Sequence, residues 1–337
     1  MKFETITIKD IAKALGLSTS TVSRALRGGY EISEETKKVV LEYAAKINYK
    51  PNPIALSLKE RRSHSIGVVV CEIANNFFSQ AINGIESIAN NAGYNVIITQ
   101  SNESYQREVV NVQHLASRSV DGLLISLSSE TSDISLIKSL HEKGLPIVFF
   151  DRVSDEIQTH KVIANNFKGG FDATEFLIRL GNKRIAHITN AAHLSITKER
   201  FEGYKAALEK NNIPFDDRYV KHCEYGGMIQ EELESTIAQL LSLPEKPDAI
   251  FIAQDKLSTG CLLALKKLDP NGELKIKIAG FTNSNVVDLF TPSITAVRQP
   301  AFEIGQAATE LLIKLIESKY PVTEFQTKVL DTELVEK

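Results

Sequence analysis

The segment LSTSTVSRALRGG, residues 17–29, places short hydroxyl side chains first and two arginines after them. In the helix that its spacing predicts, Val22, Ala25 and Leu26 lie on one side. The opposite side carries only polar residues, which are Ser20, Ser23, Arg24 and Arg27. A helix that only filled a core would not carry this second face, so the segment predicts a surface that contacts a partner.

Two more helices are expected around this segment. Thr7 can cap the first helix, with Asp10 reaching back to it in a capping box, and Gly16 can end that helix. Ser18 can cap the second helix, and Ser33 can begin a third. Two helices joined by a tight glycine turn, with the polar face of the second left exposed, are typical of a helix-turn-helix.

The polar face of the second helix suits the major groove of DNA. Thr19 and Ser20 are short enough for a close approach to base edges. Arg24 can fork onto O6 and N7 of a guanine, a contact worth about 1–3 kcal/mol of discrimination. Phosphate contacts are expected from Ser18, Thr21 and Ser23. The alternative is a plain helical hairpin with a solvated face, but the caps, the turn and the exposed face together favour DNA.

The charge of the chain supports this interpretation. Residues 1–62 hold 12 Lys and Arg against 7 Asp and Glu, whereas the remainder holds 27 against 35. A basic head on an acidic body indicates that only the head meets a polyanion.

The segment YKPNPIALSLKERRSHS, residues 49–65, leaves two interpretations open. Its short predicted helix, residues 53–59, is marginal in water on its own, yet Ala55 and Leu58 lie on an apolar edge. In one interpretation two copies order together in a minor groove and wedge Leu58 between base steps. In the other the segment is a linker that packs on its own domain.

From residue 66 onward, runs rich in Val and Ile alternate with helical stretches, beginning with IGVVVC (66–71). This alternation predicts parallel sheets covered by helices on both faces, and about ten such runs favour two lobes. Binding sites in such sheets lie beyond the carboxyl ends of the strands. Amide, carboxylate and aromatic side chains follow these runs, and an arginine lies on a neighbouring helix. Such side chains can hydrogen-bond the hydroxyl groups of a polyhydroxylated ligand and pack on its apolar face. The residues concerned are Asn75, Phe77, Phe78, Ser126, Ser128, Asp151, Arg152, Asn190, Arg200, Gln254, Asp255, Thr282 and Asn283.

Residues 7–59, from TIKDIAKALG to IALSLK, resemble the DNA-binding head of the lactose-repressor (LacI/GalR) family. The segments NNFFSQAINGIE, RFEGYKAAL and FTPSITAVRQPAFEIGQAA carry a resemblance to the family's effector-binding module, which is similar to periplasmic sugar-binding proteins. The resemblance implies a dimer on a pseudo-palindromic operator, with Leu58 intercalating at its centre and Ala55 beside it. The implied DNA-binding residues are Thr7, Ser18, Thr19, Ser20, Thr21, Ser23, Arg24, Ser33, Ala55 and Leu58.

The expected effector-binding residues are Phe77, Phe78, Ser126, Asp151, Arg200, Gln254, Asp255 and Thr282. The resemblance implies that Phe78, Asp151, Arg200, Gln254 and Asp255 lie at or beside the family's effector contacts. The chain departs from the family at Thr282 and Asn165, where an aspartate is usual or frequent. No heptad tail follows the last predicted strand near residue 330, so a dimer is expected rather than a tetramer.

The expected architecture is an all-α helix-turn-helix head with a hinge helix, followed by a two-lobed α/β domain like that of periplasmic binding proteins. The head spans residues 1–50, the hinge 51–63 and the effector domain 64–337. Lobe 1 is expected at about 64–162 and 293–322, and lobe 2 at about 163–292 and 323–337.

An enzyme or a solute receptor with an accessory helical head is the alternative class. The sequence has no phosphate-binding loop, dinucleotide fingerprint or nucleophile elbow, and its seven histidines lack metal-ligand spacing. His187 is expected to be a core residue with its hydrogen bonds satisfied. No metal or cofactor is expected.

The first residues hold no secretory signal, and no apolar window approaches the length of a membrane span. We therefore expect a cytoplasmic, homodimeric transcription regulator, by family default a repressor. Its operator affinity would be controlled allosterically by a small molecule between the lobes, expected to be a sugar or sugar derivative.

Overall fold

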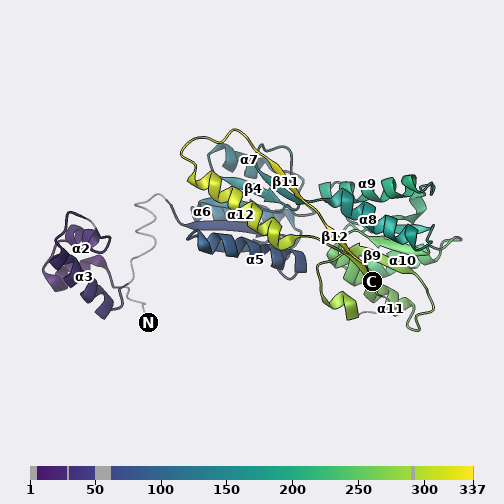
Figure 1. Ribbon diagram of the computed structural model, residues 1–337, viewed down its shortest axis with the longest axis horizontal. Helices are drawn as coiled ribbons and strands as arrows, with labels where there is room; N and C mark the ends of the chain where they lie inside the picture. The colour runs from purple at the N-terminus through teal and green to yellow at the C-terminus, as the bar shows by residue number, and fades with distance from the viewer. Residues whose placement is uncertain (1–5, 29, 50–61, 290–292, 337) are drawn as a thin grey trace. The chain divides into compact units, whose positions relative to one another are not determined.

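The computed structural model describes residues 6–28, 30–49, 62–289 and 293–336. It divides into two units, Met1–Ser63 and His64–Lys337, which are described separately below (Figure 1). The expected hinge helix, with Ala55 and Leu58, lies outside the described residues.

The head contains the helices α1 (Ile8–Leu15), α2 (Thr19–Ala25) and α3 (Glu34–Lys46). The backbone N–H of Thr7 donates to the Asp10 carboxylate at 2.8 Å, which is the return half of the predicted capping box. Gly16 ends α1 with a φ of 66°, a left-handed conformation that glycine adopts without steric cost. Ser18 accepts a hydrogen bond from the N–H of Thr21, so the predicted cap of α2 is confirmed.

The three helices enclose a small apolar core. Ile11, Val22 and Val40 are fully buried, one from each helix, and alanines fill the space between them. This packing leaves the polar face of α2 outside the core, as the helix-turn-helix interpretation requires.

The body contains two six-stranded sheets, in the orders β11-β5-β4-β3-β1-β2 and β12-β10-β9-β8-β6-β7. All pairs in both sheets are parallel except β10 with β12. The first sheet comprises β1 (Ser65–Val70), β2 (Asn95–Gln100), β3 (Gly122–Ile125), β4 (Ile147–Phe150), β5 (Lys161–Ala164) and β11 (Thr327–Leu330). The second comprises β6 (Ile185–Thr189), β7 (Val220–His222), β8 (Ala249–Ile252), β9 (Lys277–Phe281), β10 (Thr295–Arg298) and β12 (Glu333–Val335).

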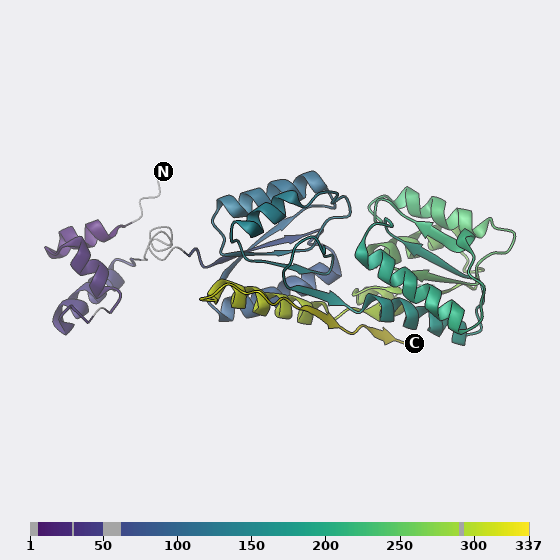
Figure 2. The ribbon, with the colours of Figure 1, turned by 90° about the horizontal axis from the view of Figure 1, so that it is seen from above.

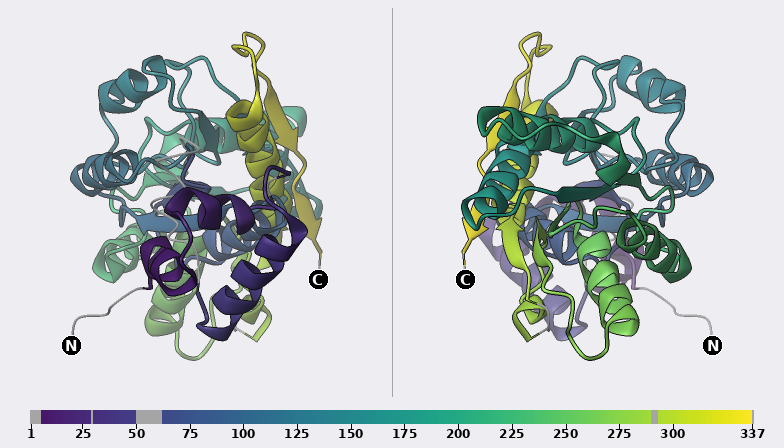
Figure 3. Two further views of the ribbon diagram at one scale, coloured as in Figure 1. Left: turned by 90° about the vertical axis from the view of Figure 1, so that its left-hand side faces the viewer. Right: turned by 90° about the vertical axis from the view of Figure 1, so that its right-hand side faces the viewer.

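Helices cover both faces of each sheet, and a separate apolar cluster lies under each helical layer (Figures 2 and 3). In the first lobe one face carries α5 (Asn76–Asn91) and α12 (Ala301–Glu317), and the other carries α6 (Tyr105–Ser117) and α7 (Ser135–Glu142). In the second lobe the corresponding pairs are α8 (Asn166–Arg179) with α9 (Ser195–Lys210), and α10 (Gln230–Leu241) with α11 (Asp255–Leu268). Two short 3₁₀ helices, η1 (Asp217–Tyr219) and η2 (Val286–Leu289), complete the elements.

The lobe boundaries expected at residues 293 and 323 need correction. β10 pairs with β9 and therefore belongs to the second lobe, whereas β11 pairs with β5 and belongs to the first. The chain crosses between the sheets after β5, after β10 and again between β11 and β12 (Figure 1). Strand pairing decides these assignments, across more than 160 residues for β11 with β5, and an apolar run by itself does not reveal its partner.

Each lobe contains one pair of helices whose backbones touch at glycines. An ideal Cβ on Gly305 would lie 2.1 Å from the carbonyl oxygen of Ala81, and one on Gly84 would lie 2.0 Å from that of Phe302. In the second lobe, Gly170 and Gly203 make the same kind of close approach between α8 and α9. Glycine is needed at these positions because a side chain would collide with the backbone of the neighbouring helix, not because of the glycine's own backbone conformation.

His187 on β6 is a core residue, as the sequence predicts. It is fully buried in a stack with Tyr204 and Phe251, whose ring centroids each lie 4.9 Å from its own. Burial lowers the pKa of His187 to about 3, because the aromatic surroundings disfavour the charged imidazolium. A hydrogen bond with the backbone of Phe251 acts to raise the pKa of His187, although neither ring nitrogen has a close hydrogen-bond partner among the described residues.

Among the described residues, no helix has the length and hydropathy that crossing a membrane requires.

We predict that Gly305→Ala lowers the free energy of unfolding by about 3 kcal/mol, because backbone atoms of α5 cannot move aside locally. The control is Gly122→Ala, whose new Cβ would meet the movable end of the Leu312 side chain at 2.8 Å. The control should cost about 1 kcal/mol. Urea denaturation measures both values, and equal costs for the two variants would contradict the backbone contact.

A second prediction concerns pH. Below pH of about 6.5 the unfolded chain protonates His187 while the native state does not, so stability falls as pH decreases. Between pH 7 and pH 5 the wild-type protein should lose about 2 kcal/mol relative to His187→Phe, which keeps the stacked ring without the titration. His114→Phe, on the exposed face of α6, should behave like wild type. Urea denaturation at several pH values in this range measures the free energy of unfolding of each variant. Identical pH dependences for wild type and His187→Phe would refute the contribution of His187.

Candidate DNA-binding surface and effector site

The predicted DNA-binding residues of α2 lie together on its exposed side. Thr19, Ser20 and Arg24 are exposed, and the hydroxyl of Ser18 lies 2.8 Å from those of both Ser20 and Thr21. Thr7 and Ser33 are also exposed, at the N-termini of α1 and α3. Free N–H groups and the positive end of a helix dipole favour phosphate at such positions.

Arg24 of α2 and Arg27, which follows α2, behave differently. The guanidinium of Arg27 folds back on α2, with Nε donating to the carbonyl oxygen of Ser23 at 3.0 Å. Arg24 extends away from the helix and pairs with Glu31, with Nη1 2.8 Å from Oε2. The sequence analysis did not single out Glu31, because no periodicity links a loop residue to a helix face.

The eight predicted effector-binding residues are all buried, with exposed fractions of 8% or less. The first lobe supplies Phe77, Phe78, Ser126 and Asp151, and the second supplies Arg200, Gln254, Asp255 and Thr282. Charged and amide side chains are rarely buried to this extent unless they are paired or belong to a site.

Arg200 is fixed on α9 within the second lobe. Its Nη1 donates to the carbonyl oxygen of Ala253 at 2.5 Å and its Nε to Asn166 at 2.9 Å. The guanidinium also lies over the ring of Phe281, 3.8 Å from the centroid. Burial lowers the pKa of Arg200 to about 10, an effect that the carboxylates of Asp151 and Asp255 oppose. Arg200 therefore stays charged at neutral pH and interacts with an acid from each lobe.

Asp151 directly follows β4 and has a φ of 60°. This left-handed conformation is uncommon for residues other than glycine, and strained backbone of this kind tends to occur at functional sites. Burial raises the pKa of the Asp151 carboxyl, while the charges of Arg152 and Arg200 act in the opposite direction. The hydroxyl of Ser126 lies 3.5 Å from its Oδ2.

Asp255 begins α11 at the end of the second sheet. Burial raises its pKa, and hydrogen bonds from the Thr282 hydroxyl and from the backbone N–H groups of Asn283 and Asn76 oppose this shift. Thr282, at the position where the family usually has an aspartate, thus supports Asp255. Asn76 belongs to the first lobe, so Asp255 faces across the boundary between lobes.

Several polar atoms near these residues are buried without a hydrogen-bond partner among the described residues. Three of them are acceptor oxygens that follow strands of the second sheet: Asn190 Oδ1, Gln254 Oε1 and Asp255 Oδ1. Arg152, in contrast, has most of its hydrogen-bond donors paired. Its Nη1 and Nη2 form a bidentate ion pair with Glu103 at 2.6 and 2.9 Å, and only Nε has no partner among the described residues.

Other polar contacts between described residues also connect the lobes. Lys256 pairs with Glu72 at 2.8 Å, and Asn283 donates to Gln80 at 2.8 Å. Nε2 of His193 lies 2.7 Å from the carbonyl oxygen of Ser129. Each contact joins residues more than 60 positions apart, and the sequence offered no signal for the pairing.

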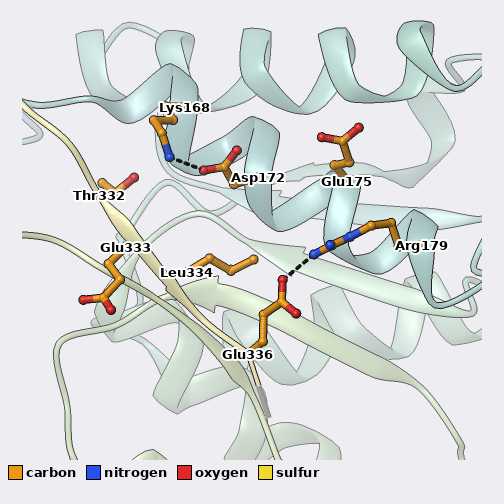
Figure 4. Close-up of a pocket in the computed structure, with 8 residues that line it drawn as sticks. All are labelled: Lys168, Asp172, Glu175, Arg179, Thr332, Glu333, Leu334 and Glu336. Atoms are coloured by element: carbon orange, nitrogen blue, oxygen red, sulfur yellow. Dashed lines mark hydrogen bonds and ion pairs between the residues drawn. The ribbon is translucent and has the colours of Figure 1, made fainter.

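Hollows are also found among the described residues of the body. A cavity of about 190 Å³ is lined by Arg152, His193 and hydroxyl side chains that include Ser128 and Thr131. A surface groove of about 610 Å³ lies between α8 and β12 (Figure 4). In that groove Lys168 pairs with Asp172, and Arg179 pairs with Glu336, so both cations are already neutralised. Within the described residues no three His, Cys, Asp or Glu side chains gather as metal ligands would.

Two family models match the chain. Residues 7–52 match the bacterial regulatory proteins of the lacI family, and residues 63–332 match the periplasmic binding proteins and sugar-binding domain of the LacI family. The ribose operon repressor of Haemophilus influenzae is 31% identical over 329 residues, which cover 96% of each chain.

Solved structures show the same fold. A complex of the transcriptional regulator CelR with cellobiose is 27% identical, with a TM-score of 0.71 and 98% of each chain covered. The lac repressor dimer bound to operator and the anti-inducer ONPF is 23% identical, with a TM-score of 0.81 over 99% of this chain and 98% of that one. Together with the helix-turn-helix head and the two-sheet body, these matches establish that the chain belongs to the LacI family of bacterial transcription regulators.

Proposed function

We propose that this regulator binds a pseudo-palindromic operator as a homodimer and acts as a repressor without catalytic activity. Thr19, Ser20 and Arg24 contact base edges, while Ser18, Thr21 and Ser23 contact phosphates, with Thr7 and Ser33 at helix N-termini beside them. Leu58 and Ala55 of the hinge act in the minor groove between the two half-sites.

We further propose that the effector is a neutral sugar or sugar derivative. The observation that carries this proposal is the set of buried acceptor oxygens on Asn190, Gln254 and Asp255 that have no partner among the described residues. An unpaired buried acceptor is costly, and a ligand rich in hydroxyl donors removes that cost.

An anionic ligand fits the three free oxygens of Asn190, Gln254 and Asp255 poorly, because it would bring further acceptors to them. Of the nearby cations, Arg200 directs Nη1 and Nε to Ala253 and Asn166, and Arg152 directs Nη1 and Nη2 to Glu103. Phe77 and Phe78, with ring centroids 5.2 Å apart, supply apolar surface of the kind on which a sugar ring can pack. The relative solved with cellobiose supports the same ligand class.

Control of DNA binding follows from ligand contacts with both lobes. A molecule held by Asp151 on one side and by Arg200 and Asp255 on the other favours one relative arrangement of the lobes. If that arrangement changes the separation of the two hinges, operator affinity changes with it. The coupling is reciprocal, so DNA changes effector affinity by the same factor.

The dimer is proposed to form through α5 and the neighbouring β2, together with the second lobe. β2 lies at the edge of the first sheet, and its Val96 and Ile98 are only partly buried. Tyr225 and Met228 expose 58% and 44% of their surface in the second lobe. The lac repressor structure, itself a dimer on operator, supports a two-subunit assembly.

The effector proposal is tested by thermal unfolding with a panel of neutral mono- and disaccharides, their phosphate esters, nucleosides and purine bases. A ligand that binds only the native state raises the melting temperature by mass action. We expect a neutral sugar to do so, and we expect Gln254→Met and Arg200→Met to lose the shift while keeping operator binding. Gln239→Met, on the exposed face of α10, is the control. A full shift in Gln254→Met, or a shift with phosphate esters alone, would exclude the proposed site chemistry.

Leu58→Ala is expected to weaken binding to an operator duplex, selected by the wild-type protein from a random library, by about tenfold or more. The reason is that the apolar wedge in the minor groove is lost. The sugar-induced thermal shift should persist, because the effector domain is unchanged. Fluorescence anisotropy measures operator affinity, and unaltered affinity would remove Leu58 from the hinge contact.

A further inference from the structure

An acidic side chain, Glu31, lies beside Arg24 on the part of the head proposed to read bases. Its carboxylate lies 2.8 Å from Nη1 of Arg24, and both side chains are about half exposed, at 50% and 56%. A carboxylate on a surface that meets phosphates weakens DNA binding at every sequence. Its position beside the arginine proposed to read a base therefore requires an explanation.

The fold holds Glu31 at this place. Gly28, with a φ of 71°, turns the chain away after α2. On the other side of Glu31, Ile32 packs against the apolar core of the head, and Ser33 caps α3 through the N–H of Thr36. Glu31 is thus the last residue before an anchored segment, and its carboxylate reaches the end of the recognition helix.

The geometry of a guanidinium allows Arg24 to serve two partners at once. It has five N–H donors in one plane, and Glu31 uses a donor on Nη1. The edge formed by Nε and Nη2 remains available for O6 and N7 of a guanine. Arg27 shows the contrast, because its Nε and Nη2 are both occupied by Ser23 of α2.

We propose that Glu31 is a positioning residue that orients Arg24 for guanine readout, so that it raises base discrimination and lowers affinity for DNA in general. This inference rests on the proposed role of Arg24 in reading a base. The two effects of Glu31 are separable, since its charge acts equally on every sequence and its contact with Arg24 acts at a single base pair.

The experiment uses the full-length protein and the operator duplex selected from a random library by wild type. Anisotropy titrations measure affinity for that duplex, for a scrambled duplex, and for duplexes altered symmetrically at one base pair per half-site. Arg24→Ala first identifies the base pair at which preference is relaxed. Glu31→Gln should then reduce discrimination at that pair by about fivefold, the contribution expected of an exposed ion pair, and leave the other pairs unchanged. Its binding to the scrambled duplex should be as tight as that of wild type, or tighter.

Glu35→Gln is the matched control, because it removes an exposed carboxylate from the first turn of α3 in the same head. It should alter affinity for all duplexes alike and leave discrimination intact. In an Arg24→Ala background, Glu31→Gln should no longer change discrimination at the identified pair.

Unchanged discrimination in Glu31→Gln, or an equal loss with and without Arg24, would overturn the positioning role while leaving the Arg24 assignment in place. If Arg24→Ala relaxed no base pair, the proposed function of Arg24 itself would fail and the role of Glu31 with it. Melting temperatures of all variants verify that each is folded.

Discussion

A buried polar atom must find a hydrogen-bond partner, and this constraint governs the effector domain. Asn190, Gln254 and Asp255 each follow or begin an element at the end of the second sheet and keep an oxygen buried without a partner among the described residues. Leaving such an acceptor unpaired costs about 1–3 kcal/mol. The protein tolerates this cost at several neighbouring positions, which is the pattern of a site prepared for a ligand rather than of a core optimised for stability.

Close packing between α8 and α9 fixes the position of Arg200. α8 and α9 approach until an ideal Cβ on Gly170 would lie 2.4 Å from the carbonyl oxygen of Arg200. This contact holds the backbone of Arg200, while Asn166 and Ala253 hold its guanidinium. The charged group that interacts with acids from both lobes is therefore rigid, and a ligand meets it without the entropy cost of ordering it.

Local chemistry made much of this architecture predictable. The caps at Ser18 and Ser33 and the turn at Gly16 depend on neighbouring residues, and the sequence analysis identified each of them. The ends of parallel strands gather at one edge of a sheet, so Asp151, Gln254 and Asp255 were identifiable as buried site candidates.

What could not be predicted is which elements contact each other. The sheet membership of β10 and β11 and the contacts of Lys256 with Glu72 and of Arg24 with Glu31 depend on the arrangement of elements in space. Composition and periodicity do not show which elements contact each other in the folded chain.

One chain of polar contacts joins the end of β4, where the proposed effector site lies, to the boundary between the lobes. Arg152, next to the strained Asp151, holds Glu103 through two hydrogen bonds. Glu103 in turn accepts the backbone N–H of Ser129 at 2.8 Å, and the carbonyl oxygen of Ser129 meets His193 of the second lobe. Because Asp151 and Arg152 are adjacent in the chain, a ligand bound as proposed that displaced Asp151 would also displace Arg152, which belongs to the contacts that lead to His193. Since ion pairs and hydrogen bonds of this kind either persist or break, they give a two-lobed receptor discrete arrangements between which a bound molecule can select.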